Sequence, residues 1–515
     1  MPVAMTVKTA ELPTDVKELH HLVIEQNKKI QFLEEELRLA KAHRFGRSAD
    51  REIEEKQARL FNEAEDGAEQ KSAQPSSEPP IPVGAHNRKK AGRRALPENL
   101  PREEIVHDIP EEQKVCACGA VMKRMGEEAS EQLEVIPAQA KVIRHVRPKY
   151  ACRVCQGVDT EGGAVKIAPP AEQLIPKSIA TPGLLAFLMV NKFADALPFY
   201  RQEKIFARMG VELSRTTMCT WAMEVADRLS PLLHLMRDQI RAGPYVQIDE
   251  TPLQVLEDPG STSQMWVYRG GQPRAPTIFY AYHPSRSGDV PFEFLDGYRG
   301  WVQTDGYAGY DKLGRCEGVV MLGCWAHARR KFVDVTKAAS MGSAAHEAIE
   351  YIRKLYAVET DAEQRSLDET QRAELRRSKT VPMLEEFHGW LVKLQDQTPP
   401  QGLLGKAVNY TLGQWDRLER YVQHGMLRPD NNLAENAIRP FVVGRKNWLF
   451  SATSRGAQAS AALYSLIESA KANGHEPYWY LRFLFEGLIS ARTAEQFTAL
   501  LPQNIDPKTL RPDPK

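Results

Sequence analysis

Apolar residues near the start of the chain recur at the two positions of a heptad repeat. One position holds Val16, Val23, Ile30 and Leu37, and the other holds Leu19, Gln26, Leu33 and Ala40. This pattern predicts a coiled coil over 14–45 that joins copies of the chain, with polar Gln26 able to set register or strand number. Because the run spans only about three to four heptads, an amphipathic helix packed on its own domain is the alternative.

The helical period returns over 175–238 and predicts a helical domain. Within it, Tyr200–Met209 predicts one helix, Gly210–Leu213 a tight turn, and Ser214 the N-cap of a second helix that begins at Arg215. This is the spacing of a helix-turn-helix, whose second helix can reach base edges in the major groove. An ordinary helical hairpin fits the same segment.

After Gly243-Pro244 the apolar pattern changes to a period of two, which predicts strands. The predicted strands are Tyr245–Asp249, Met265–Tyr268, Thr277–Tyr282, Trp301–Asp305 and Gly318–Cys324. A helix is expected to begin at Trp325. Three consecutive strands, two further strands and then helices suit a mixed sheet flanked by helices, and an RNase-H-like core over 243–332 in particular.

The composition of the chain indicates a linker and limits where DNA could be bound. Residues 64–105 are rich in Glu, Gln, Ser, Pro and Lys, so we expect a flexible linker there. Its basic run, Arg88 to Arg94, could follow a phosphate backbone or be a solvated charge run. The 515 residues include 68 basic and 67 acidic side chains, a net charge of +1, so any DNA contact must come from local patches.

No secretory signal is recognisable over 1–15, and the longest apolar stretch, Leu184–Val190, is far shorter than the roughly 20 residues that span a bilayer. We therefore expect a cytoplasmic protein without membrane contact. In such a reducing compartment, clustered cysteines indicate metal binding rather than disulfides.

Four of the 7 cysteines form two close pairs, Cys116 with Cys118 and Cys152 with Cys155. Two thiolate pairs on two turns can offer Zn²⁺ a tetrahedral sulfur site in a module too small to fold on apolar burial alone. We predict a zinc-ribbon-like module over 106–165, with strand-like pieces at Leu133–Ile136 and Lys141–Val146 between the pairs. Reduced surface thiols in a hairpin are the alternative.

Two predicted strands end in a carboxylate, Asp249 and Asp305. If the first and fourth strands are neighbours, both aspartates project at one sheet edge, and Glu435, at the start of a later helix, could join them. Oxygen ligands suit Mg²⁺ or Mn²⁺. Each residue also has a structural interpretation: Asp249 and Asp305 could form turns, and Glu435 could complete a capping box with Asn432 or pair with Arg439.

Five stretches together resemble the TnpC-type transposases of the insertion sequence 66 family. They are VIPAQAKVIRHVRPKYACRVC at 135–155, QIDETP at 247–252, QTDGYAGY at 303–310, GCWAHARRKF at 323–332 and DNNLAENAIRPFVVGRKNWLF at 430–450. The resemblance runs over nearly the whole chain. It implies a bacterial, nucleoid-associated DDE transposase with Asp249, Asp305 and Glu435 as its triad.

The resemblance also implies a domain order. A helical insertion would occupy 333–425, the last part of the catalytic core 426–485, and a C-terminal segment 486–515. The fold class expected is therefore a multidomain α+β chain: coiled coil, zinc module, helix-turn-helix domain, and an RNase-H-like mixed α/β core with a helical insertion. The partners expected are terminal inverted repeats, target DNA and further copies of the chain. Whether accessory transposition proteins take part stays open.

Further residues are candidates around this site. Cys324 and His327 form a C-x-x-H element that could assist at the active-site edge or be core packing. Trp448 could stack on an unpaired base or be a core tryptophan. The candidate DNA contacts are Arg215, Arg329, Arg330, Arg439, Arg445, Lys446 and Arg455. Two rival functions are another RNase-H-like nuclease and a non-catalytic DNA-binding regulator derived from a transposase.

Overall fold

The computed structural model describes residues 140–151, 165–258, 263–336 and 343–510, with isolated residues between Asp15 and Leu33. The four paired cysteines, the linker and the strand piece at Leu133–Ile136 lie outside the described residues. Most of the predicted coil also lies outside them. Its described residues Val23, Ile30 and Leu33 are helical and about half exposed, at 52%, 51% and 56%.

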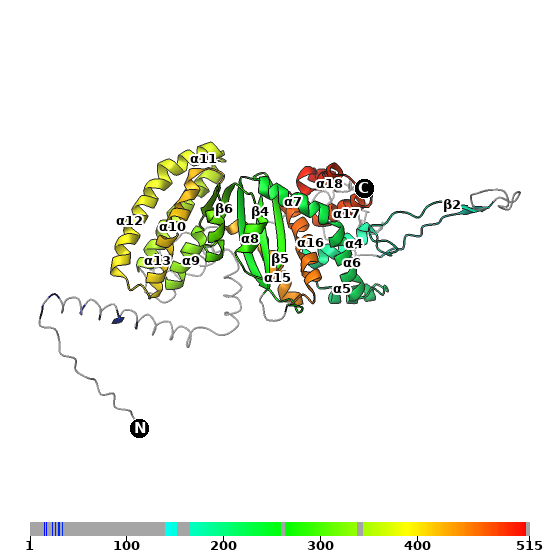
Figure 1. The fold of residues 1–515 in the computed structure, drawn as a ribbon, viewed down its shortest axis with the longest axis horizontal. Helices are drawn as coiled ribbons and strands as arrows, with labels where there is room; N and C mark the ends of the chain where they lie inside the picture. Colours follow the sequence, from blue (N-terminus) through cyan, green and yellow to red (C-terminus); the bar gives the residue numbers. More distant parts are fainter. Residues whose placement is uncertain are drawn as a thin grey trace, which may run out of the picture.

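Two sheets are present in the described ranges. The strands are β1 (Lys149–Ala151), β2 (Val165–Ile167), β3 (Tyr245–Leu253), β4 (Ser263–Gln272), β5 (Ala275–His283), β6 (Gly300–Gln303) and β7 (Val319–Leu322). β1 and β2 pair antiparallel in a hairpin that extends away from the body of the molecule (Figure 1). The strand predicted at Lys141–Val146 is wrong: these residues are in no strand, and Val142 and Val146 are 95% and 70% exposed, so their alternation has no buried face to match.

The larger sheet has the strand order β5-β4-β3-β6-β7. β5, β4 and β3 pair antiparallel, whereas β3, β6 and β7 pair parallel. The expectation that the first and fourth core strands are neighbours is confirmed, with Gln247 opposite Gln303. β3 continues past Asp249 to Leu253, so the turn interpretation of Asp249 is wrong.

Helices make up most of the remaining described chain. They are α4 (Pro182–Phe193), α5 (Phe199–Arg208), α6 (Arg215–Arg228), α7 (Ser230–Ala242), α8 (Asp289–Phe294), α9 (Trp325–Thr336), α10 (Ala344–Gln364), α11 (Glu369–Leu375), α12 (Val381–Gln397), α13 (Leu403–Gly413), α14 (Trp415–Glu419), α15 (Asn432–Trp448), α16 (Ser454–Ala472), α17 (Pro477–Ser490) and α18 (Ala494–Ala499). Short 3-10 helices lie at Ala308–Arg315, Arg420–Gln423, Pro502–Asn504 and Pro507–Thr509, and a π-helix at Arg376–Thr380. None of the described helices is long and apolar enough to cross a bilayer.

The predicted helix, turn and N-cap between α5 and α6 are confirmed. α5 ends at Arg208, Gly210 adopts φ +77° in the turn, and the hydroxyl of Ser214 accepts the N–H of Thr217 at 3.1 Å. The side chains of Met218 and Trp221 on α6 are buried, so this helix packs on the protein by one face and presents the other to solvent.

Helices cover both ends of the sheet (Figure 1). At the β5 edge, the hydroxyls of Ser465 and Ser469 on α16 accept the N–H groups of Tyr280 and Ile278, each at 2.8 Å. These bonds satisfy an edge strand that would otherwise be open to pairing. At the opposite end lies the predicted insertion at 333–425. Its described residues are mostly helical, as expected.

A buried arginine ties these inserted helices to the chain that returns to the sheet. The guanidinium of Arg376 is fully buried, forms a bidentate pair with Glu359 at 2.8 and 2.7 Å, and donates to the carbonyls of Tyr421, His424 and Leu427 at 2.7–2.9 Å. Every described donor direction of this side chain has an acceptor, so a buried charge is tolerated here.

Arg376→Met is expected to lower the free energy of unfolding by about 3 kcal/mol or more, because it leaves the buried carboxylate of Glu359 without its bidentate partner. Arg372, 3.7 Å from Glu359, keeps the cost near the lower end of that range. Urea unfolding followed by circular dichroism measures it. Arg377→Met is the matched control, since Arg377 is exposed and pairs with exposed Glu374, and should cost less than about 1 kcal/mol. Equal losses in both variants would contradict this role of Arg376.

Candidate active site

Asp249 and Asp305 lie at corresponding positions of two adjacent parallel strands. Gln247 of β3 is opposite Gln303 of β6, and each aspartate follows its glutamine by two residues. Asp305 comes just after β6, where its Oδ1 accepts the N–H of Tyr307 at 2.8 Å across Gly306, which has φ +86°. The turn interpretation of Asp305-Gly306 is therefore correct, and the turn leaves the second carboxylate oxygen free of that bond.

Glu435 reaches the same edge from the first turn of α15. The residue before this helix, Asn431, is fully buried; its side chain donates to the carbonyl of Ile248 at 2.8 Å, and its N–H donates to Cys324 Sγ at 3.2 Å. The start of α15 is thus bound to β3 beside Asp249 and to the residue that precedes α9.

The alternative interpretation of Asn432 and Glu435 as a capping box is wrong. Asn431 is the N-cap and Asn432 is already helical, and the N–H of Asn432 donates to Asp430 Oδ1 at 3.1 Å. The carboxylate of Glu435 instead lies 3.5 Å from His327 Nδ1 and 3.6 Å from Arg330. It therefore faces α9.

Several negative groups surround Asp249. Burial, followed by the charges of Glu435, Glu250 and Asp305, raises the pKa of Asp249 well above its usual value. A shift from these neighbours requires the carboxylates to lie close together. Such a cluster is unfavourable in the metal-free chain, and a bound divalent cation would offset the repulsion. Three carboxylates as donors fit Mg²⁺ or Mn²⁺.

Glu250 is a fourth carboxylate that the sequence reasoning did not single out. It forms hydrogen bonds with Arg286 at 2.8 and 2.6 Å and accepts the hydroxyl of Tyr310. Its charge is compensated by the protein itself, so it supports the edge rather than offering open ligand positions. The Asp-Glu pair in QIDETP was the available signal.

Cys324 and His327 lie beside this edge, as the C-x-x-H element suggested. Cys324 is 1% exposed and ends the loop before α9, and His327 is in the first turn of that helix. Burial, assisted by the charge of Arg330, lowers the pKa of His327 to about 4. The imidazole is therefore neutral near neutral pH.

The candidate DNA contacts are distributed over several elements. Arg329 and Arg330 are on α9, and Arg439, Arg445 and Lys446 are on α15. Arg445 donates to the hydroxyl of Thr251 at 3.2 Å, which holds it beside β3, and Lys446 is exposed.

Trp448 is half-buried against the helical core, with Lys192 Nζ 4.6 Å from the centre of its ring. A neighbouring cation and the core already engage the ring, which favours the core interpretation of this tryptophan. Arg455 forms an exposed pair with Asp227 at 2.6 Å, linking α16 to α6.

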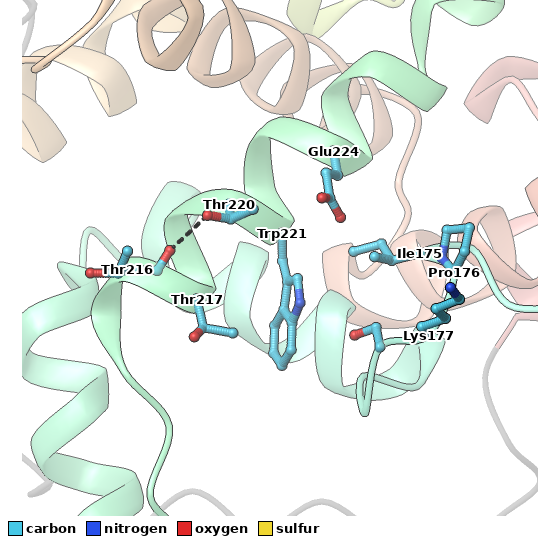
Figure 2. Close-up of a pocket in the computed structure, with 9 residues that line it drawn as sticks. Ile175, Pro176, Lys177, Thr216, Thr217, Thr220, Trp221 and Glu224 are labelled. Atoms are coloured by element: carbon cyan, nitrogen blue, oxygen red, sulfur yellow. Dashed lines mark hydrogen bonds between the residues drawn. The ribbon is translucent and has the colours of Figure 1, made fainter.

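A polar cleft of about 290 Å³ lies at the start of α6. Figure 2 shows Thr216, Thr217 and Thr220 of α6 on one side and the segment around Lys177 on the other, with the ring of Trp221 between them. Ser214, Arg215, Thr216 and Thr220 are exposed. The first turns of the predicted recognition helix therefore present hydroxyls and one cation to solvent.

Comparison with protein families covers the chain from near its start. The model described as Transposase IS66 family matches residues 177–459, and that of the IS66 C-terminal element matches 465–503. The zinc-finger binding domain of transposase IS66 matches 113–156, and Transposase C of IS166 homeodomain matches 32–105. The mixed sheet and these matches define the class: a DDE transposase, an enzyme that acts on DNA and generally uses a divalent metal. The chain belongs to the IS66 family of transposases.

Curated relatives from Sinorhizobium fredii (strain NBRC 101917 / NGR234) extend over most of the chain. The protein named "Uncharacterized protein y4jD" is 35% identical over 79% of this chain and 81% of its own length. "Uncharacterized protein y4qI" is 33% identical, over 81% of this chain and 78% of its own length. Their names add no activity.

The carboxylate cluster predicts a pH effect on the metal-free protein. The folded-state pKa of Asp249 is raised above the ordinary 3.8, so the folded chain loses stability as pH rises through 3.8 toward the folded-state value. Asp249→Asn should remove this loss and raise the Tm in chelator near neutral pH, with little change in strong acid. Thermal unfolding followed by circular dichroism at several pH values checks it. Exposed Asp296→Asn is the control and should change the Tm at neither pH; a lower Tm for Asp249→Asn at neutral pH would contradict the cluster's repulsion.

Proposed function

We propose that Asp249, Asp305 and Glu435 hold the divalent cations of a transposase that cuts and joins DNA at the ends of an insertion sequence. The observation that carries this proposal is the convergence of the three carboxylates. The first two come from adjacent parallel strands, the third from a helix start bonded to one of those strands. The strand order, with three antiparallel strands followed by two parallel ones, supports an RNase-H-like core.

When bound, the cations would activate an attacking water and stabilise the leaving oxygen at phosphorus. Attack by water breaks the phosphodiester bond at the element's end and leaves a 3′-OH. That hydroxyl then attacks a phosphodiester of target DNA and displaces another 3′ oxygen. Neither displacement forms a bond to the protein, so no nucleophilic side chain is required.

The chain's own residues provide the rigid ligand positions. Asp249 is within a strand and its Oδ1 accepts the N–H of Glu250 at 3.0 Å; Asp305 is held by the N–H of Tyr307. In each carboxylate the other oxygen is available to a cation. Arg330 beside Glu435 adds positive charge where a phosphate would approach.

Recognition of the element's ends is assigned in this proposal to α5 and α6. The exposed Arg201, Lys204 and Arg208 of α5 can contact phosphates, and the polar start of α6 can enter the major groove. In the alternative, an ordinary helical hairpin, these exposed groups would contact only solvent.

The N-terminal parts complete the proposed function. All four cysteines, Cys116, Cys118, Cys152 and Cys155, lie within the range matched by the zinc-finger model, which supports one structural Zn²⁺. The heptad at 14–45 would join copies of the chain, as required to hold two element ends together. The exposure of its described seam residues Val23, Ile30 and Leu33 agrees with a face that a second copy covers.

Glu435→Gln should reduce cleavage of DNA carrying the element's ends roughly a hundredfold or more, because a neutral amide is a poor ligand for a hard cation. Binding of the same DNA and the Tm should change little. A gel assay of end cleavage and strand transfer in Mg²⁺ measures this, and it also separates a transposase from a simple nuclease and from a non-catalytic regulator. Asp311→Asn, whose carboxylate pairs with Arg417, is the control and should cleave normally. Near-parental cleavage by Glu435→Gln would mean that another residue is the third ligand, with Asp430 as the first candidate.

Arg215→Ala should weaken binding to end DNA and reduce the slope of log affinity against log salt by about 1, as expected for one lost phosphate contact. Fluorescence anisotropy at several salt concentrations measures both. Arg228→Ala removes an exposed arginine from the other end of the same helix and is the matched control. If the two variants bind alike, the start of α6 is not the DNA-reading element.

A further inference from the structure

Three side chains with different metal-binding chemistry meet where α9 and α15 begin. The Cys324 thiol, the His327 imidazole and the Glu435 carboxylate each offer one ligand atom, and the three atoms lie within 4.8 Å of one another. Two of these residues come from one short C-x-x-H stretch, and the third comes from more than a hundred residues later in the chain. The cluster is therefore a product of the tertiary fold.

The imidazole of His327 points a buried nitrogen at this cluster. Nδ1 is shielded from solvent and makes no hydrogen bond; Glu435 Oε1 lies 3.5 Å away, beyond good hydrogen-bond geometry. A buried polar nitrogen without a partner is costly and requires an explanation such as a missing ion. Ligand atoms around a tetrahedral Zn²⁺ are separated by about 3.3–3.8 Å, so the observed spacing of His327 and Glu435 suits a shared ion.

The sulfur of Cys324 lies where backbone N–H groups at the starts of α9 and α15 face it. Sγ accepts the backbone N–H of Asn431 at 3.2 Å and also the backbone N–H of His327. Burial and the charges of Glu435 and Asp430 hold the pKa of this thiol well above its usual value in the metal-free chain, and the two N–H groups act in the opposite direction.

We propose that Cys324, His327 and Glu435 form a three-ligand site for a transition-metal ion, Zn²⁺ in first place. Three protein ligands leave one position of a tetrahedral ion open, as in catalytic rather than structural zinc sites. Sulfur and nitrogen ligands select such an ion over Mg²⁺. Glu435 then belongs to two sites, since its carboxylate also borders Asp249, and an ion at Cys324 and His327 would hold that carboxylate in place.

The site's existence does not depend on the proposed DNA chemistry, and its test uses metal content rather than activity. The full-length protein is stripped with chelator, reloaded with a small molar excess of Zn²⁺, desalted and analysed by mass spectrometry for zinc per chain. Cys324→Ser and His327→Gln should each hold about one zinc fewer than the parent, whatever the N-terminal cysteines retain. Cys316→Ser, which changes a thiol outside the cluster, is the matched control and should hold as much as the parent.

A second measurement covers variants that fail to fold. Anomalous scattering at the zinc edge from crystals of the parent protein should give a peak between Cys324, His327 and Glu435. Equal zinc in the parent and both folded variants, or no peak at this position in zinc-loaded crystals, would overturn the proposal. Loss of zinc in the variants of a protein that never cleaves DNA would support this site and refute the proposed function separately.

Discussion

The site depends on two buried glutamine amides that lie opposite each other on β3 and β6. Gln247 Nε2 donates to Gln303 Oε1 at 2.8 Å and to the carbonyl of Asp430 at 2.9 Å, while Gln303 Nε2 donates to the carbonyls of Gly323 and Arg428 at 2.8 and 3.0 Å. Both side chains are fully buried. Because a buried carbonyl without a donor costs about 1–3 kcal/mol, this pair holds four separate segments of chain at one sheet edge. The two aspartates and the helix that carries the third carboxylate are placed by it.

The inserted helices contribute to the same placement from the other side. Arg376 binds the carbonyls of Tyr421, His424 and Leu427, which belong to the segment that runs directly into the loop held by the two glutamines. The insertion is thus part of the support for α15 and not a separate appendage. A π-helix begins at Arg376, and the side chain of this arginine is fully buried.

Burial of Asp249, together with the charges of Glu435, Glu250 and Asp305, raises the pKa of this carboxyl, so gathering carboxylates at this edge is unfavourable without a cation. Glu250 shows the contrasting solution, since Arg286 and Tyr310 already compensate its charge. On the far side of Glu435, Cys324 and His327 bring softer ligands to the same carboxylate. One edge of the sheet therefore combines a hard oxygen cluster, a compensated carboxylate and a mixed sulfur and nitrogen cluster.

Local periodicity determined much of the fold: the five core strands, the helix from Trp325, and the turn with its Ser214 N-cap all follow from spacing and turn chemistry within a few residues. The placement of Asp249 and Asp305 near each other was also predictable, because each comes at the end of a strand pattern and the two strands were expected to be neighbours. The position of Glu435 at the start of a helix was predicted correctly, but the alternative interpretation of a capping box with Asn432 is wrong, because Asn431 is the N-cap and its side chain binds the carbonyl of Ile248. The meeting of His327 with Glu435, and the compensation of Glu250 by Arg286, required the tertiary structure. Propensity acts over one or two turns, whereas these contacts join residues 36 to 108 positions apart, and only packing of the whole sheet and insertion decides such pairs.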